Sequence, residues 1–378
     1  MTEPFVPPPY PYDRLAEVVD VARRHPGGAV DLSVGTPCDA PPPEVVAALG
    51  GSDTERGYPF SIGSSAFRQA AAGWMSRRLG VDVDVAAIAG CVGTKEFVAG
   101  LPHLLKLRRP DLDTVLYPAI SYPSYAMGAT LAGCRAVPVP VDDEWRIDLS
   151  AIDPHDAARA LCLWVNTPGN PAGGLDDLEA AAAWGRRHAV PVFSDECYVE
   201  FTWEGPRRTI LRSSDGTGAG NANEGLVAVH SLSKRSNLAG VRAGFYAGDP
   251  ELVEYLSEVR KHQGLMIPGP VQAAAVAAWA DDEHVEVQAA RYRARLERMI
   301  GQLGRLGIEA EMPDGAFYLW VAAPGGDAWA LAHRLAADLG IVVSPGEFYG
   351  EAASGYVRLA AVQPDDALDL VDERLDAL

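Results

Sequence analysis

Lys234 stands among residues that could bind an aldehyde and a phosphate at one place. It follows the apolar run 226–229, which predicts a buried strand, and Ser231 and Ser233 lie between that run and the lysine. A lysine at the carboxyl end of a strand can form a Schiff base with an aldehyde cofactor, while the serines and the guanidinium of Arg242 can bind its phosphate. Taken alone, the segment fits a solvated surface turn better, so the rest of the chain has to decide.

Asp195 and Tyr198 lie at the end of a second expected strand. Ligands of an open parallel sheet bind at the carboxyl ends of its strands, and Asp195 directly follows the apolar sequence PVFS. A buried carboxylate needs a cationic partner, and a protonated pyridine nitrogen would supply one. A helix N-cap is the competing interpretation of Asp195, and Tyr198 would fit the core as well as it fits a ligand.

Asn170 and the segment that begins with Gly93 are further candidates at strand ends. Asn170 lies in the turn NTPGNPAG after the apolar sequence ALCLWV, and this density of proline and glycine fixes a rigid turn that could aim a side chain into a cleft. A structural Asx-turn explains Asn170 equally well. Gly93, Thr94 and Lys95 follow AIAGCV and open a helix, so their backbone N–H groups could cradle a phosphate, although most such glycine turns bind nothing.

The elements that would position these residues alternate between strands and helices from about residue 45 onward. The expected strands span 87–92, 114–117, 136–141, 160–165, 190–194 and 226–230, and the expected helices span 96–107, 122–132 and 175–188. This alternation predicts an α/β fold with a mainly parallel sheet and right-handed crossovers.

The rest of the chain predicts a second, smaller lobe, because 378 residues exceed the size of one hydrophobic core. A proline-rich arm precedes a helix at 15–24, residues 213–224 form a surface loop, and 271–306 form a long helical stretch. Strands near 317–321, 341–343 and 356–359 belong to an α+β lobe. We therefore expect an arm with part of the small domain at 1–44, a large domain at 45–275 and a small domain at 276–378.

The composition narrows the class of protein. A formal net charge of −19 argues against a nucleic acid or an anionic membrane surface as partner, but it allows anionic small substrates. The five cysteines show no CxxC pairing, as in cytoplasmic proteins with reduced thiols, so neither a disulfide framework nor a metal site is expected. The N-terminus lacks the pattern of a secretory signal, and no apolar run approaches the ~20 residues of a membrane span. We expect a cytoplasmic protein that acts on small molecules.

The motifs VGTKE, YPSY, NTPGNPAG, SDECY, SLSKRSNLAGVRAG and YVRLA occur in this order along the chain. As an ordered set they resemble the fold-type I pyridoxal-phosphate aminotransferases of the class I/II group. Further stretches, among them RGYPFSIGSSAFRQA, VRKHQGLMIPGPVQAA and VSPGEFYG, resemble the succinyldiaminopimelate aminotransferases of bacterial lysine and diaminopimelate biosynthesis. The resemblance implies pyridoxal 5'-phosphate as cofactor, a mainly parallel seven-stranded sheet in the large domain, and a smaller α+β domain.

Carried over residue by residue, the resemblance gives the candidates catalytic roles. Lys234 would hold the cofactor as a Schiff base and, once released, would move the proton between the substrate Cα and the cofactor carbon. Asp195 would keep the pyridine nitrogen protonated, so that the ring can act as an electron sink. Tyr198 and Asn170 would hydrogen-bond to the phenolic oxygen of the ring, and Tyr122 would stack on its face.

The resemblance also implies the sites for phosphate and substrate. Tyr58 would reach the phosphate of a partner subunit, which implies a homodimer with shared active sites. Arg358 would bind the substrate α-carboxylate through two nitrogens, beside Asn170 and the backbone N–H of Gly35, a task for which a guanidinium is better suited than an ammonium. The phosphate would lie among Gly93, Thr94, Lys95 (through its backbone), Ser231, Ser233 and Arg242. The chain departs from the family at Arg235, where a small residue or threonine is frequent, and the sequence gives no account of it.

The implied reaction uses L-glutamate as amino donor and N-succinyl-2-amino-6-oxopimelate as acceptor. Such a substrate carries several carboxylates, so more cations than Arg358 should line the pocket; Arg23, Arg24 and Lys261 are candidates by location, but solvated positions suit each of them better. The core motifs equally fit a transaminase of aspartate, alanine or LL-diaminopimelate, and they fit a C–S β-lyase. An aminotransferase-like effector domain of a transcription regulator would need a DNA-binding module, and no basic helix-turn-helix segment is evident.

Overall fold

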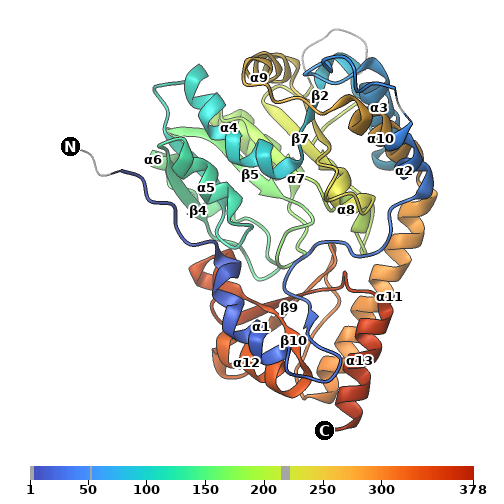
Figure 1. The fold of residues 1–378 in the computed structure, drawn as a ribbon. Coiled ribbons are helices and arrows are strands. Elements are labelled where there is room, and N and C mark those ends of the chain that lie inside the picture. The colour runs from blue at the N-terminus through green and yellow to red at the C-terminus, as the bar shows by residue number, and fades with distance from the viewer. Residues whose placement is uncertain (1–3, 52, 214–221) are drawn as a thin grey trace.

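The computed structural model describes residues 4–51, 53–213 and 222–378 (Figure 1). A seven-stranded sheet forms the centre of the larger lobe, in the order β2-β8-β7-β6-β5-β3-β4. β8 alone runs in the opposite direction to the other six of these strands, so the predicted mainly parallel sheet is confirmed. The strands are β2 (Ile88–Cys91), β3 (Thr114–Pro118), β4 (Arg135–Val139), β5 (Ala160–Asn166), β6 (Val192–Asp195), β7 (Leu226–Ser231) and β8 (Gly244–Gly248).

Helices cover both faces of this sheet, which is why its strands are continuous apolar runs in the sequence. In β7, Val227 and Val229 pack with α4, α5 and α9 on one face. Leu226 and Ala228 pack with α3, α7 and α10 on the other. The helices of this lobe are α2 (Pro43–Gly50), α3 (Ser65–Leu79), α4 (Thr94–Arg108), α5 (Ser124–Leu131), α6 (Pro154–Ala157), α7 (Leu178–His188), α8 (Leu232–Arg235), α9 (Pro250–His262) and α10 (Gly269–Ala280).

The smaller lobe contains a three-stranded sheet in the order β11-β12-β9 and a two-stranded sheet of β1 and β10. Figure 1 shows it packed below the large sheet, with the N-terminal arm along one side of the large lobe and the chain before α2 crossing between the lobes. The sequence suggests divisions at residues 44 and 275, which fall within α2 and α10, so we propose boundaries at the nearby ends of these helices, before Pro43 and after Ala280. The elements of this lobe are α1 (Ala16–Ala22), β1 (Val30–Asp31), α11 (Glu283–Arg305), β9 (Tyr318–Ala322), α12 (Ala328–Leu339), β10 (Ile341–Val342), β11 (Ser344–Pro345), β12 (Tyr356–Ala360) and α13 (Asp365–Asp376).

Two parts of the pattern-based prediction need correction. The stretch 271–306 is not one helix, because α10 ends at Ala280 and Asp281 adopts an extended backbone at the break. The carboxylate of Asp281 then accepts a hydrogen bond (2.9 Å) from the backbone N–H of Glu283 at the start of α11. The helix expected at 15–24 is shorter, since a 3-10 turn (Pro11–Leu15) precedes α1. Most of the loop expected at 213–224 lies outside the described residues.

The strand β8 escaped the pattern-based prediction because glycine begins and ends it, and glycine weakens a strand signal. Both glycines lie against β7. A Cβ at Gly244 would lie 2.5 Å from the carbonyl oxygen of His230, and one at Gly248 would lie 2.1 Å from that of Leu226. Close approach of the two strands therefore requires glycine at both positions. In the part of the chain that the structure describes, no helix is long and apolar enough to span a bilayer.

Candidate active site

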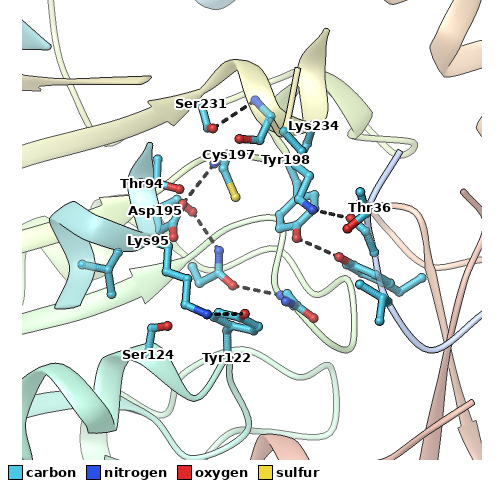
Figure 2. Close-up of a pocket in the computed structure, with 18 of the residues that line it drawn as sticks. Thr36, Thr94, Lys95, Tyr122, Ser124, Asp195, Cys197, Tyr198, Ser231 and Lys234 are labelled. Carbon is cyan, nitrogen blue, oxygen red and sulfur yellow. Dashed lines mark hydrogen bonds between the residues drawn. The ribbon is translucent and has the colours of Figure 1, made fainter. Parts of the chain in front are cut away.

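A cavity of about 470 Å³ opens at the carboxyl ends of β5, β6 and β7 (Figure 2). Of the predicted site residues, it brings together Gly35, Thr94, Lys95, Tyr122, Asn170, Asp195, Tyr198, Ser231, Ser233, Lys234, Arg242 and Arg358. Gly93 lies next to this set, as the residue before α4. Tyr58 does not contribute to the cavity, and its side chain is fully exposed. The sequence motifs thus converge in space, with Tyr58 as the exception.

Lys234 lies in the short helix α8, which begins where Ser231 accepts a hydrogen bond (3.1 Å) from the backbone N–H of Ser233. Its ammonium donates to the carbonyl oxygen of Gly35, on the segment that crosses from the small lobe. Burial, helped by the nearby positive charges of Arg358 and Arg242, lowers the pKa of Lys234 to about 8. The lowered pKa leaves a larger fraction of the amine unprotonated, and the unprotonated amine is the form that attacks an aldehyde.

This lowered pKa predicts how fast the apoprotein takes up an aldehyde cofactor. At pH 7 a lysine with a pKa near 8 is unprotonated in about one molecule in ten, whereas an ordinary lysine is unprotonated in about one in 3,000. We expect the loading rate to rise with pH up to about 8 and then to level off, because the amine of Lys234 is by then mostly unprotonated. Stopped-flow absorption at several pH values measures it. A rate that still rises tenfold per unit between pH 9 and pH 10 would show an ordinary lysine.

Arg235, for which the sequence offers no account, anchors the helix that carries Lys234. Its side chain is 2% exposed and contacts carboxylates on both sides, Glu200 at 3.1 Å and Asp282 at 2.9 Å. It also donates to the carbonyl oxygen of Ala278 at 2.7 Å. A buried guanidinium with this many fixed acceptors holds its own backbone in place, and therefore that of the preceding lysine.

Asp195 ends β6 and is 7% exposed, so burial raises the pKa of its carboxyl group. One carboxylate oxygen accepts from the backbone N–H of Cys197 at 3.2 Å and the other from the hydroxyl of Tyr125 at 3.0 Å. The turn expected of a capping aspartate is therefore present, but the carboxylate also faces the cavity and has no cationic partner among the described residues. Tyr125 was missed from the sequence, although it is the second tyrosine of the motif YPSY.

Asn166, not Asn170, has the structural role that the sequence left open. The amide nitrogen of Asn166 donates to the carbonyl oxygen of Asp195 at 2.9 Å, and its amide oxygen accepts from the backbone N–H of Asn170 at 2.9 Å. This bond from a side chain to the backbone four residues on fixes the loop and leaves the side chain of Asn170 facing the cavity. There its oxygen accepts a hydrogen bond of 2.7 Å from the guanidinium of Arg358.

Arg358 enters the cavity from β12 of the small lobe and is 1% exposed. Its guanidinium also donates to the carbonyl oxygen of Ser33 at 2.6 Å and to the hydroxyl of Tyr12 at 3.2 Å. All of these acceptors are neutral, and no carboxylate of the described chain lies within ion-pair distance of it. A buried cation is costly without an anion, so the arrangement suits an incoming carboxylate.

The phosphate of pyridoxal 5'-phosphate, the cofactor that the resemblance implies, fits the far end of the cavity. Arg242 faces the N-terminus of α4 and has no carboxylate partner among the described residues, so two positive groups meet there. A Cβ at Gly93 would lie 2.2 Å from the guanidinium of Arg242, so only glycine leaves this cradle open. With the phosphate there, Lys234 would bind the aldehyde and Asp195 would contact the pyridine nitrogen, so the residues present fit the whole cofactor.

Lys95 has a role that the sequence did not suggest, because its side chain as well as its backbone lies in the cavity (Figure 2). Its ammonium donates to the hydroxyls of Tyr122 at 3.2 Å and Tyr10 at 3.4 Å, and no described carboxylate lies within ion-pair distance. Tyr10 comes from the proline-rich arm, which thus forms a wall of the site. Arg23, Arg24 and Lys261, the cations considered from the sequence, do not line the cavity.

Comparison with known proteins identifies the family. The sequence model of the family "Aminotransferase class I and II" matches residues 28–374. A transaminase of Streptomyces rimosus, OxyQ, named for 4-dedimethylamino-4-oxo-anhydrotetracycline, is 41% identical over 97% of this chain and 99% of its own. An LL-diaminopimelate aminotransferase of Aquifex aeolicus is 33% identical over 98% and 97%. The structure of a probable N-succinyldiaminopimelate aminotransferase of Thermus thermophilus superimposes with a TM-score of 0.84 at 30% identity, covering 97% of this chain and all of that one.

Proposed function

The chain belongs to the class I and II aminotransferases, which depend on pyridoxal 5'-phosphate, and from this membership we propose a specific reaction. The enzyme moves an amino group between L-glutamate and N-succinyl-2-amino-6-oxopimelate, in diaminopimelate and lysine biosynthesis. It works as a cytoplasmic homodimer. The likeness to the Thermus protein supports this substrate.

Four cations face the cavity without carboxylate partners among the described residues, and the observation that carries the proposal is that Arg358 and Lys95 remain once Lys234 and Arg242 are assigned to the cofactor. Arg358 is the buried one and Lys95 lies at the opening. A substrate with a carboxylate at each end neutralises both, whereas a monocarboxylate amino acid leaves Lys95 with tyrosine hydroxyls alone. We assign the α-carboxylate to Arg358 and a distal carboxylate of the succinylated substrate to Lys95.

The residues act in the reaction as follows. Bound pyridoxal 5'-phosphate supplies an electrophilic carbon and a ring that accepts electrons. Arg358 orients the substrate, so that its Cα–H points at Lys234. The amine of Lys234 takes that proton and later returns it. Asp195 holds a proton at the pyridine nitrogen by its negative charge, and Tyr198 donates to the phenolic oxygen, with Asn170 beside it.

The proposed substrate is tested by measuring glutamate formed from 2-oxoglutarate with a panel of amino donors. N-succinyl-LL-diaminopimelate should give the highest kcat/KM, above LL-diaminopimelate, aspartate and alanine. If one of those donors exceeds it tenfold, the enzyme remains a transaminase with another substrate. Release of ammonia and pyruvate from a cysteine conjugate without a new amino acid would instead indicate a C–S β-lyase.

The likeness to OxyQ, 41% identical along nearly the whole chain, favours a second candidate. In this alternative the acceptor is a ketone such as 4-dedimethylamino-4-oxo-anhydrotetracycline, and the tyrosine-rich walls of the cavity, Tyr10, Tyr12 and Tyr122, pack against it. The compound is offered as acceptor with glutamate as donor. An aminated product at a rate above that with N-succinyl-2-amino-6-oxopimelate would favour this function over the first.

Lys95→Gln tests the assignment of the distal carboxylate. Loss of one charge-assisted hydrogen bond is expected to raise the KM for N-succinyl-LL-diaminopimelate ~10- to 100-fold with little change in kcat, because Lys95 is assigned to a distal carboxylate that takes no part in the reaction. The matched control is Lys261→Gln, which removes an exposed lysine paired with Glu258 outside the cavity. Equal KM values for the two variants would remove Lys95 from substrate recognition.

Tyr58→Phe tests the proposed dimer with shared sites. Tyr58 is fully exposed and Phe60 is 73% exposed, and two large aromatic side chains in this state suit an interface. If Tyr58 reaches the phosphate in a partner subunit, its loss should weaken cofactor binding ~10-fold. The control is Tyr356→Phe, whose ring stacks on Trp320 outside the cavity. Sedimentation that shows a fully active monomer would contradict the dimer.

A further inference from the structure

Tyr318 lies between the cofactor-binding part and the substrate-binding part of the active site, although the sequence analysis did not identify it. It is 1% exposed and begins β9. Its hydroxyl lies 2.8 Å from the hydroxyl of Tyr198, which we place at the phenolic oxygen of the cofactor. Its ring lies 4.1 Å from the guanidinium carbon of Arg358, which we place at the substrate carboxylate. One side chain thus contacts a cofactor-binding and a substrate-binding residue.

The fold fixes Tyr318 in this position from two sides. β9 and β12 are antiparallel neighbours, with Trp320 opposite Arg358, so Tyr318 and Arg358 are diagonal neighbours on the sheet. On the other side, a Cβ at Gly35 would lie 2.1 Å from the hydroxyl oxygen of Tyr318. Glycine at position 35 is therefore required for this hydroxyl to reach Tyr198, which gives Gly35 a role besides its expected one toward the substrate.

The direction of the hydrogen bond between the hydroxyls of Tyr198 and Tyr318 follows from the number of hydrogens that each can donate. Each tyrosine hydroxyl has one hydrogen, and if Tyr198 donates its hydrogen to the phenolic oxygen, it can only accept from Tyr318. The guanidinium of Arg358 favours this order, because a cation over the ring of Tyr318 makes its hydroxyl a better donor. Donation to Tyr198 in turn strengthens the bond that Tyr198 makes, since hydrogen bonds in a chain polarise one another.

We propose that Tyr318 is a positioning residue for transamination: its hydroxyl donates to Tyr198, which donates to the phenolic oxygen of the cofactor, and its ring holds Arg358 in line for the substrate carboxylate. The inference rests on the role proposed for Tyr198 and not on the identity of the amino donor. It applies to any substrate that Arg358 binds by a carboxylate.

The test separates hydroxyl from ring. Tyr318→Phe removes the hydroxyl alone, Tyr318→Leu removes both, and Tyr198→Phe and the double Phe variant complete a cycle. The first readout is the pH midpoint of the visible absorption change of the loaded enzyme, which reports the proton on the bond between Lys234 and the cofactor. The second is the dissociation constant of maleate, a dicarboxylate, measured by calorimetry on the apoprotein.

A donor to the phenolic oxygen stabilises its negative charge, so losing that donor makes the neighbouring proton harder to remove and raises the midpoint. We expect Tyr198→Phe to raise it by about one unit or more, Tyr318→Phe by about half a unit, and the double variant no further than Tyr198→Phe. Tyr318→Phe should leave maleate affinity within about twofold, whereas Tyr318→Leu should weaken it about tenfold.

Three results would overturn the inference. One is a wild-type midpoint in Tyr318→Phe while Tyr198→Phe is shifted, and another is an additive shift in the double variant. The third is wild-type maleate affinity in Tyr318→Leu, with circular dichroism showing that the variant is folded. If Tyr198→Phe itself does not shift the midpoint, the role of Tyr198 is wrong and the inference fails with it, while transaminase activity in the same preparation leaves the proposed function standing.

Discussion

With alanine in place of Lys234, transamination is expected to fall by at least about 10⁴-fold while the chain stays folded. The amine is both the group that holds the cofactor and the base that moves the substrate proton. Its removal costs the fold little, because it deletes a buried amine with a lowered pKa and a single bond to the carbonyl oxygen of Gly35. Single-turnover kinetics measure the loss, and circular dichroism checks the fold.

Two further measurements make this result specific to Lys234. After borohydride reduction, mass spectrometry should find the cofactor on the peptide of the wild-type protein that contains Lys234 and on no peptide of the variant. Lys261→Ala, an exposed lysine outside the cavity, should retain both activity and labelling. Appreciable steady-state transamination by Lys234→Ala would mean that another amine does this chemistry.

Asp195→Asn is expected to lower kcat by about 10³-fold or more, because the isosteric amide cannot hold a proton at the pyridine nitrogen by charge. The amide oxygen can accept from the backbone N–H of Cys197 and the amide nitrogen can donate to the hydroxyl of Tyr125, so the shape of the site is retained. Tyr125→Phe is the milder variant for comparison. It keeps the negative charge and removes one hydrogen bond, and it should lower kcat by no more than about tenfold. Equal losses in the two variants would mean that the charge of Asp195 is not what matters.

The sheet and most of the site could be predicted because local sequence determines both. Strands buried on two faces are continuous apolar runs, and the residues that follow them meet at one edge of a parallel sheet. Asp195, Asn170 and Lys234 were found in this way. The family resemblance added what spacing alone could not, namely that Arg358 on β12 reaches the same cavity from the other lobe.

What the sequence did not provide depends on contacts between distant segments. Tyr318 becomes visible only when β9 pairs with β12, and Tyr10 only when the arm lies across the cavity. The side chain of Lys95 could have pointed to solvent as easily as toward Tyr122. The role of Arg235 is evident only from its ion pair with Glu200, which lies on a different element. No local pattern encodes these neighbours.

The central claim is a transaminase whose substrate is N-succinyl-LL-diaminopimelate. It is tested most directly by titrating the cofactor-loaded protein with N-succinyl-LL-diaminopimelate, without 2-oxoglutarate, and recording the visible spectrum. The account predicts that the band of the lysine-bound cofactor converts to that of the amine form at low substrate concentration, and that 2-oxoglutarate restores it. A band that responds to aspartate or alanine but not to the succinylated compound would contradict the proposed substrate. A loaded protein without a lysine-bound band would contradict the site built on Lys234.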